Sequence, residues 1–288
     1  MKRPTLAFAL LTPATVIMVA LLVLPVGYLI RFSLFEGQGS IQQLGGFTLD
    51  NYIKLFSDTF YVGILGKTVW LSFLTTVISA FTGYLLAHFM WRAPKEWRGA
   101  LTILVLSPLL VSIVVSSYGW IVVLGNNGVI NDFLQWIGLT NAPIKIMFTD
   151  AAIVIGLVHI VMPFMVLSIL AALERIDPML VEAAATLGAN RFRAIFHVVL
   201  PLALPGIGAG TTIVFSLAIS AYVTPAVLGG SGPNFITTLV FHQFVTLFNW
   251  PFGATVAALL LAVALGIVFL YVRVLSRLGA LGTRKEAT

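Results

Sequence analysis

The chain has 288 residues, of which 59% are hydrophobic and only 9% charged, and its formal net charge is +6. A soluble domain carries roughly 25% charged residues, so this composition excludes a water-soluble globule. The absence of cysteine excludes structural disulfides, thiolate zinc sites and cysteine nucleophiles. On a membrane protein, a basic balance reflects cytoplasmic loops, and no nucleic-acid partner is expected.

Six blocks are long and apolar enough to cross a bilayer, since a spanning helix needs about 20 mostly apolar residues. In chain order, the predicted spans are about 6–30, 68–91, 99–124, 151–173, 202–228 and 252–272. No charge lies between Pro4 and Ile30, which is longer than the apolar part of a signal peptide. We therefore predict an uncleaved first helix and an all-α integral membrane protein with one transmembrane domain, 1–288.

The last two spans are separated by two breaks, because no Asp, Glu, Lys or Arg occurs between Ala194 and Val272. Glycine and proline in residues 229–234 end the fifth span, and Pro251 marks the second break. The piece between them, 235–248, is too short to span. It is expected to be a surface or re-entrant segment.

The basic residues orient the spans, because Lys and Arg accumulate in cytoplasmic loops. If the N-terminus lies on the cytoplasmic side, four basic residues lie on the outer side of the membrane: Arg31, Lys54, Lys67 and Lys145. Twelve then lie on the inner side: Lys2, Arg3, Arg92, Lys95, Arg98, Arg175, Arg191, Arg193, Arg273, Arg277, Arg284 and Lys285. Both termini are therefore predicted to be cytoplasmic.

The inner loop 174–199 is the most polar part of the chain. Asp177 followed by Pro178 is a helix start, with an N-cap and proline at the first helical position. Gly188 stands where a C-terminal cap is needed, and a second helical run begins near Asn190. These signals predict a short cytoplasmic helix, a tight turn and a return into the membrane.

The short helix of this loop is suited to docking. Three consecutive alanines, 183–185, leave it thin on one side, so that it can lie deep in a groove of another protein. Glu182, Arg191 and Arg193 can fix its register by ion pairs at the rim. The sequence therefore predicts a docking loop.

The same loop resembles the permeases of type I ABC importers. Their pattern is Glu-Ala-Ala, three residues, Gly, nine residues, an aliphatic residue, any residue and Leu-Pro. Here it is carried at the same spacings by Glu182, Ala183, Ala184, Gly188, Val198, Leu200 and Pro201. The resemblance covers about residues 6–275 and implies the type I importer permease fold.

The resemblance also implies partners and roles. The loop would insert into a cleft on a separate ATPase subunit, with ATPase-coupling residues Glu182, Ala183, Ala184, Gly188, Arg191, Arg193, Leu200 and Pro201. Two such ATPases would bind ATP and Mg, while this chain would bind no cofactor. A second permease subunit, a periplasmic solute-binding protein and a bacterial inner membrane complete the implied assembly.

Within the family, the chain is most similar to the spermidine/putrescine branch. The similar segments are Ser107-Pro108, Tyr118-Gly119-Trp120, 124–131, 222–225, 228–230 and 249–253. That branch uses two different permeases, which favours a heterodimer. One departure is the stretch Ser220-Ala221-Tyr222, where polyamine permeases often carry a carboxylate. No Asp or Glu lies inside a predicted span, which leaves a zwitterion, an anion or a weak cation open beside a polyamine.

Candidate residues for the translocation path are seven polar and aromatic side chains of the third, fourth and fifth predicted spans. They are Tyr118, Trp120, His159, Ser216, Ser220, Tyr222 and Thr224. Polar groups at membrane depth usually face the bundle interior. The alternative for the histidine and hydroxyl groups is a helix-to-helix hydrogen bond. The alternative for Tyr118 and Trp120 is anchoring at the membrane interface.

Two other function classes remain to be separated from an ATP-driven permease. An ion-coupled carrier or channel would usually need buried ionisable groups, and the predicted spans hold no Asp, Glu, Lys or Arg, with His159 the candidate among their histidines. A membrane-embedded enzyme would need paired carboxylates, a metal cluster or a nucleophile with its base. The sequence shows none of these, so no catalytic residue and no metal are expected.

Overall fold

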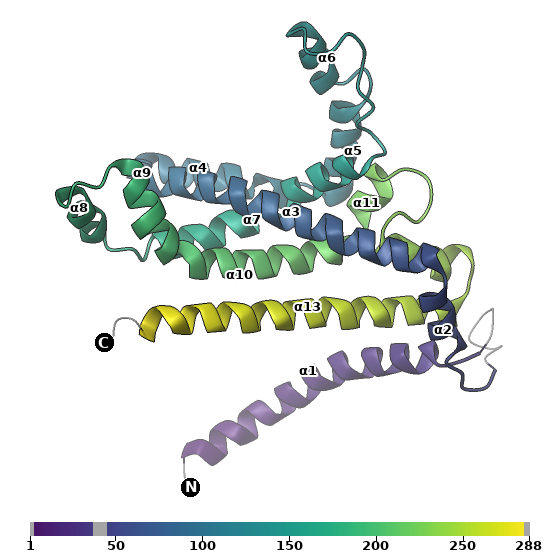
Figure 1. Cartoon of the computed structure of the whole chain (residues 1–288). Helices are drawn as coiled ribbons and strands as arrows, with labels where there is room; N and C mark the ends of the chain where they lie inside the picture. The colour runs from purple at the N-terminus through teal and green to yellow at the C-terminus, as the bar shows by residue number, and fades with distance from the viewer. Residues whose placement is uncertain (1–2, 37–44, 285–288) are drawn as a thin grey trace. The chain divides into compact units, whose positions relative to one another are not determined.

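The computed structural model describes residues 3–36 and 45–284, and every regular element in them is a helix (Figure 1). Six helical stretches of this described part are long and apolar enough to cross a membrane: Leu11–Ser33, Thr59–Arg92, Ile113–Trp136, Asp150–Leu173, Arg191–Ile219 and Trp250–Arg273. The predicted all-α class and the number of spans are confirmed. Lys2 and Lys285, two of the predicted cytoplasmic cations, lie outside the described residues.

The chain divides into two compact units, which are described separately. The first contains the described residues of Met1–Gly63 together with Ile236–Val263, and the second contains Ile64–Phe235 and the described residues after Val263. The organisation of the whole chain as one permease domain stays a prediction.

Hydrogen bonds of hydroxyl groups join the helices of the first unit. Its helices are α1 (Arg3–Ser33), α2 (Asp50–Ser57), α12 (Ile236–Phe241), the π-helical turn η3 (His242–Thr246) and the first part of α13 (Trp250–Arg284). The hydroxyls of Ser33 and Tyr52 lie 2.7 Å apart, and Thr255 Oγ1 donates to the Ser33 carbonyl at 3.1 Å. In the segment 235–248, Ile236 and Leu239 of α12 are buried, whereas Val245, Leu247 and Phe248 are exposed.

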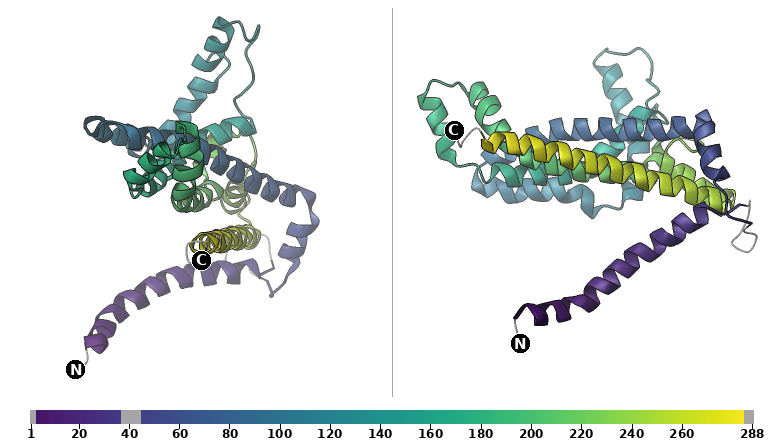
Figure 2. Two further views of the ribbon diagram at one scale, coloured as in Figure 1. Left: turned by 60° about the vertical axis from the view of Figure 1, so that its left-hand side comes forward. Right: turned by 60° about the horizontal axis from the view of Figure 1, so that its bottom comes forward.

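The second unit is built around α7 (Asp150–Leu173), which is buried along most of its length. The other helices are α3 (Thr59–Arg92, beginning in the first unit), α4 (Lys95–Leu110), α5 (Ile113–Leu124), α6 (Val129–Trp136), α8 (Pro178–Thr186), α9 (Arg191–Ala194), the π-helical turn η2 (Ile195–Val199), α10 (Leu200–Ile219) and α11 (Val223–Leu228). Helices α4, α5, α10 and α11 pack against α7, and Figure 2 shows the ribbon from two further sides.

Glycine permits the close contact between α7 and α10. A Cβ atom at Gly206 would lie 2.4 Å from Ala172 Cβ and 2.7 Å from the Ser168 carbonyl oxygen. A Cβ at Gly210 would lie 2.7 Å from Met165 Sδ. Two glycines four residues apart on an apolar helix allow two backbones to approach closely, which is a main source of helix association in a bilayer.

Two predicted spans are interrupted in the structure. The third, 99–124, is divided between α4 and α5, because Val111 is extended (φ −98°, ψ 138°). The fifth, 202–228, is divided between α10 and α11, with non-helical backbone at 220–222. Pro225 explains why a helix cannot run on through this second break, since its ring would clash with the carbonyl four residues earlier.

Candidate functional site

Local hydrogen bonds define both ends of α8 in the loop 174–199. The Asp177 carboxylate accepts from the Met179 amide at 2.9 Å, with Pro178 at the first helical position. At the other end, Gly188 has φ +84°. Its amide donates to the Ala185 carbonyl at 3.0 Å, and the Ala189 amide donates to the Ala184 carbonyl at 3.0 Å. This pair of bonds is a Schellman motif, and the predicted start and cap of the helix are confirmed.

The return toward the membrane begins with a second capped turn. Asn190 Oδ1 accepts from the Arg193 amide at 2.8 Å, which starts α9 at the predicted position. The π-helical turn η2 follows, and Leu200 and Pro201 begin α10. A π-helical turn holds one more residue than an α-helical turn, so η2 sets how α10 is rotated relative to α9.

The loop has one fixed face and one open face. Ile176 is 7% exposed and belongs to a core cluster with Met165, Ile169 and Leu173 of α7, against which Val181 also packs. The open face is defined by Leu187, which is 88% exposed, and Phe192, which is 73% exposed. Large exposed apolar side chains are suited to contact with another protein.

The predicted coupling residues differ in exposure. Glu182, Ala183, Gly188, Arg191, Arg193 and Pro201 are exposed, and Ala184 and Leu200 are half-buried. Glu182 and the two arginines form no ion pair with each other in the described part of the chain. Their charges are therefore available to a partner.

A cavity of about 380 Å³ lies where the two helix breaks meet α7. Val111 and Ile113 line it from the first break, and Phe164 lines it from α7. Ser220, Tyr222 and Thr224 line it from the second break. The structure therefore brings together three of the predicted path residues.

The other predicted path residues lie outside this cavity. Trp120 and His159 contact each other edge to face, with ring centroids 5.5 Å apart. Tyr118 is 59% exposed, and Ser216 Oγ donates to the Thr212 carbonyl of its own helix at 2.8 Å. Such a bond inside one helix satisfies the hydroxyl without a ligand.

The cavity is mainly apolar, and its lining contains no charged side chain. Helix α4 ends beside it at Leu110, with Val111 extended. The last carbonyl groups of a helix lack partners within it and carry partial negative charge. The rings of Phe164 and Tyr222 add faces that attract cations. This arrangement suits a cation that meets no carboxylate.

Sequence reasoning missed most of the apolar lining of the cavity. Besides Val111, Ile113 and Phe164, these residues are Pro108, Leu109, Leu157, Ile160, Val161, Leu217, Ala221 and Val223. Pro108 was the available signal, because a proline within an apolar helix marks a place where backbone bonds are lost. The remaining residues carry no sign of cavity lining in the sequence.

Comparison with known proteins gives related sequences over most of the chain. Residues 3–278 match the family described as binding-protein-dependent transport system inner membrane component. The spermidine/putrescine transport system permease protein PotB of Haemophilus influenzae is 35% identical over 253 residues, which is 88% of this chain and 86% of that protein. The PotB protein of Escherichia coli is 34% identical over 224 residues, covering 78% and 81%.

More distantly related proteins also match the chain. The sulfoquinovosyl glycerol transport system permease protein SmoG of Agrobacterium fabrum is 28% identical, covering 94% of this chain and 90% of that protein. A solved bacterial ABC transporter involved in import of the acidic polysaccharide alginate has a chain of similar fold, with a TM-score of 0.74, 22% identity and 96% of both chains covered. At this identity the structural likeness speaks for the fold alone.

Proposed function

The chain belongs to the family of binding-protein-dependent transport system inner membrane components and is a permease subunit of an ABC importer, and from this premise we propose how it works. The loop 174–199 couples it to partner ATPase subunits. The cavity between the helix breaks forms part of the path of a small cationic or zwitterionic organic solute. The open apolar face of the loop is the observation that carries this proposal.

The coupling role follows from the construction of the loop. Ile176 and Val181 tie α8 to the core around α7, while Leu187 and Phe192 remain open to a partner. A force applied to the open face would therefore reach α7 and α10 through packed side chains. Two partner ATPases would bind ATP and Mg and supply that force.

The proposed assembly has further members. A second, different permease subunit would complete the path, and a periplasmic solute-binding protein would deliver the solute to it. The excess of basic residues in the loops assigned to the inside supports a bacterial inner membrane with both termini in the cytoplasm. This topology places α8 in the cytoplasm and Lys145 on the outer side.

The proposed solute class rests on the chemistry of the cavity. The PotB relatives are named for spermidine and putrescine, which are multivalent amines. Here the lining of the cavity offers no carboxylate, so an amine would be held by the carboxyl end of α4 and by the rings of Phe164 and Tyr222. The start of α5 at Ile113 places amide groups beside the same cavity, which would suit a carboxylate of a zwitterion.

Energy coupling is tested with the assembled complex in proteoliposomes, comparing wild type with Glu182→Lys. We expect uptake to require ATP, and the variant to lose most receptor-stimulated hydrolysis because the charge at its docking surface is reversed. The matched control is Glu96→Lys, the same charge change at an exposed residue outside the loop 174–199. Uptake driven by a proton or sodium gradient without ATPase subunits would show an ion-coupled carrier instead.

The solute class is tested at Phe164, using Phe164→Leu to remove the ring while keeping an apolar side chain of similar size. A cation–π contact contributes about 0.5–2 kcal/mol, so the solute concentration for half-maximal uptake should rise roughly 2- to 30-fold. Phe81→Leu is the matched control, since Phe81 is exposed on α3 and does not line the cavity. Equal uptake kinetics for the two variants would contradict a cationic group at this ring.

A further inference from the structure

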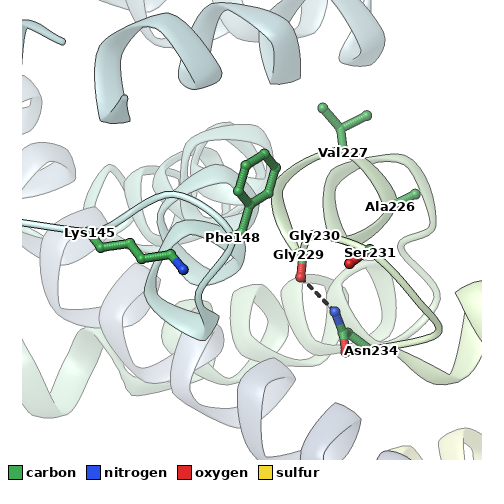
Figure 3. Close-up of a pocket in the computed structure, with 8 residues that line it drawn as sticks. All are labelled: Lys145, Phe148, Ala226, Val227, Gly229, Gly230, Ser231 and Asn234. Carbon is green, nitrogen blue, oxygen red and sulfur yellow. Dashed lines mark hydrogen bonds between the residues drawn. The ribbon is translucent and has the colours of Figure 1, made fainter. Parts of the chain in front are cut away.

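A second cavity, of about 560 Å³, lies between the segment before α7 and the loop that follows α11. Figure 3 shows Lys145 and Phe148 on one side of it, and Gly229, Gly230 and Asn234 on the other. The predicted topology places it on the outer side of the membrane, away from the coupling loop.

Two residues that line this outer cavity have a left-handed backbone conformation. Phe148 has φ +61° and Gly230 has φ +85°, and a Cβ atom at Gly230 would lie 3.1 Å from Phe148 Cβ. Asn234 Nδ2 donates to the Gly229 carbonyl at 2.6 Å, the bond drawn in Figure 3. A non-glycine residue in the left-handed region persists only where its surroundings fix it, and such residues gather at functional sites.

Lys145 is the one charged side chain that lines the outer cavity. The other three basic residues assigned to the outer side have partners. Arg31 lies over the Phe35 ring at 5.7 Å, Lys54 lies over the Phe252 ring at 5.1 Å, and Lys67 pairs with Asp150 at 2.6 Å. Lys145 has no partner in the described part of the chain, so the cavity holds an uncompensated positive charge.

Helix α11 connects the outer cavity with the solute cavity. Its first residues, Val223 and Thr224, line the solute cavity, and Ala226 and Val227 line the outer cavity. It packs closely on α7, since a Cβ at Gly156 would lie 2.5 Å from Leu228 Cδ1. A group bound in the outer cavity therefore contacts the same helix that borders the path of the solute.

We propose that the outer cavity receives an acidic side chain of the solute-binding protein, whose carboxylate pairs with Lys145. This inference rests on the proposed function. The charge argues against a cationic solute as the occupant, because the ammonium group of Lys145 would repel it. A carboxylate on a folded receptor matches the charge, and pairing at such a contact chiefly speeds and orients docking.

The test measures the receptor concentration that gives half-maximal ATPase stimulation of the full complex in lipid nanodiscs, at low and high salt. Lys145→Glu should raise this concentration about tenfold at low salt, and Lys145→Gln should flatten its dependence on salt. Basal hydrolysis without receptor should stay unchanged in both. Lys54→Gln, which removes the same charge from another outer lysine, should behave as wild type.

Chemical cross-linking identifies the partner group. A carbodiimide should join Lys145 to one aspartate or glutamate of the receptor in the wild-type complex, and the product should be missing in Lys145→Gln. Half-maximal concentrations within twofold of wild type for Lys145→Glu would overturn the inference, while stimulation of the wild type leaves the proposed function standing. If receptor fails to stimulate the wild-type complex at all, the proposed function fails and the inference with it.

Discussion

Replacing Gly188 with valine reduces receptor-stimulated ATP hydrolysis of the assembled complex roughly 5- to 30-fold. The φ of +84° at this position costs an L-residue about 1–2 kcal/mol, and a β-branched side chain is among the least suited to it. The Schellman bonds that end α8 would open, so the docking helix would lose its fixed direction relative to α9. Since a Cβ at Gly188 meets nothing within 4 Å, the effect comes from the backbone alone.

Gly138→Val provides a matched control for this experiment. Gly138 has φ +75°, and a Cβ there also meets nothing within 4 Å, but it follows α6, on the side predicted to face outward. The same strain should leave ATP-driven stimulation within about twofold of wild type, because this turn lies outside the coupling loop. Equal losses in the two variants would mean that strain, and not the coupling loop, limits the activity.

Replacing Gly206 with leucine prevents α10 from packing on α7 and sharply lowers the yield of folded complex. A Cβ at this position would lie 2.7 Å from a backbone oxygen, that of Ser168, which cannot move aside as a flexible side chain could. Overpacking of this kind costs about 1–3 kcal/mol, occasionally more. The measurement is the midpoint of thermal unfolding in detergent together with the monodisperse fraction.

Gly119→Leu is the control for the packing experiment. A Cβ at Gly119 meets nothing within 4 Å, and leucine favours a helix more than glycine does. This variant should be as stable as wild type or slightly more stable. If Gly206→Leu unfolds at the same temperature as Gly119→Leu, the close packing of α7 on α10 is not required.

The features that could be predicted from the sequence depend on local chemistry. Asp177, Pro178 and Gly188 each fix the backbone through their own side chain or lack of one, so the start and end of α8 were visible in advance. Apolar runs of sufficient length predicted the number of spans, because the length of an apolar run is also a local property of the sequence. The coupling role itself came from a spaced pattern that resembles that of a known family, and it stays a prediction.

Other features depend on contacts that a linear pattern does not record. The break at 111–112 contains neither glycine nor proline, so hydropathy runs through it unchanged. Ser220 and Tyr222 were expected along a continuous helix but lie at a break, which is why they reach the cavity and Ser216 does not. The sequence does not show that Lys145 lacks a partner in the described part of the chain. This emerges only from the structure, in which the other outer basic residues do have partners.

The open face of the loop 174–199 also bears on the life of the chain before assembly. With Leu187 and Phe192 largely exposed, a newly inserted copy without the proposed ATPase partner would display apolar side chains on the side predicted to be cytoplasmic. Exposed surface of this kind is what chaperones and proteases use to triage incomplete proteins. If the proposed ATPase partner covers this face, copies of the chain that lack the partner would be removed, and the abundance of the subunit would follow the supply of the ATPase.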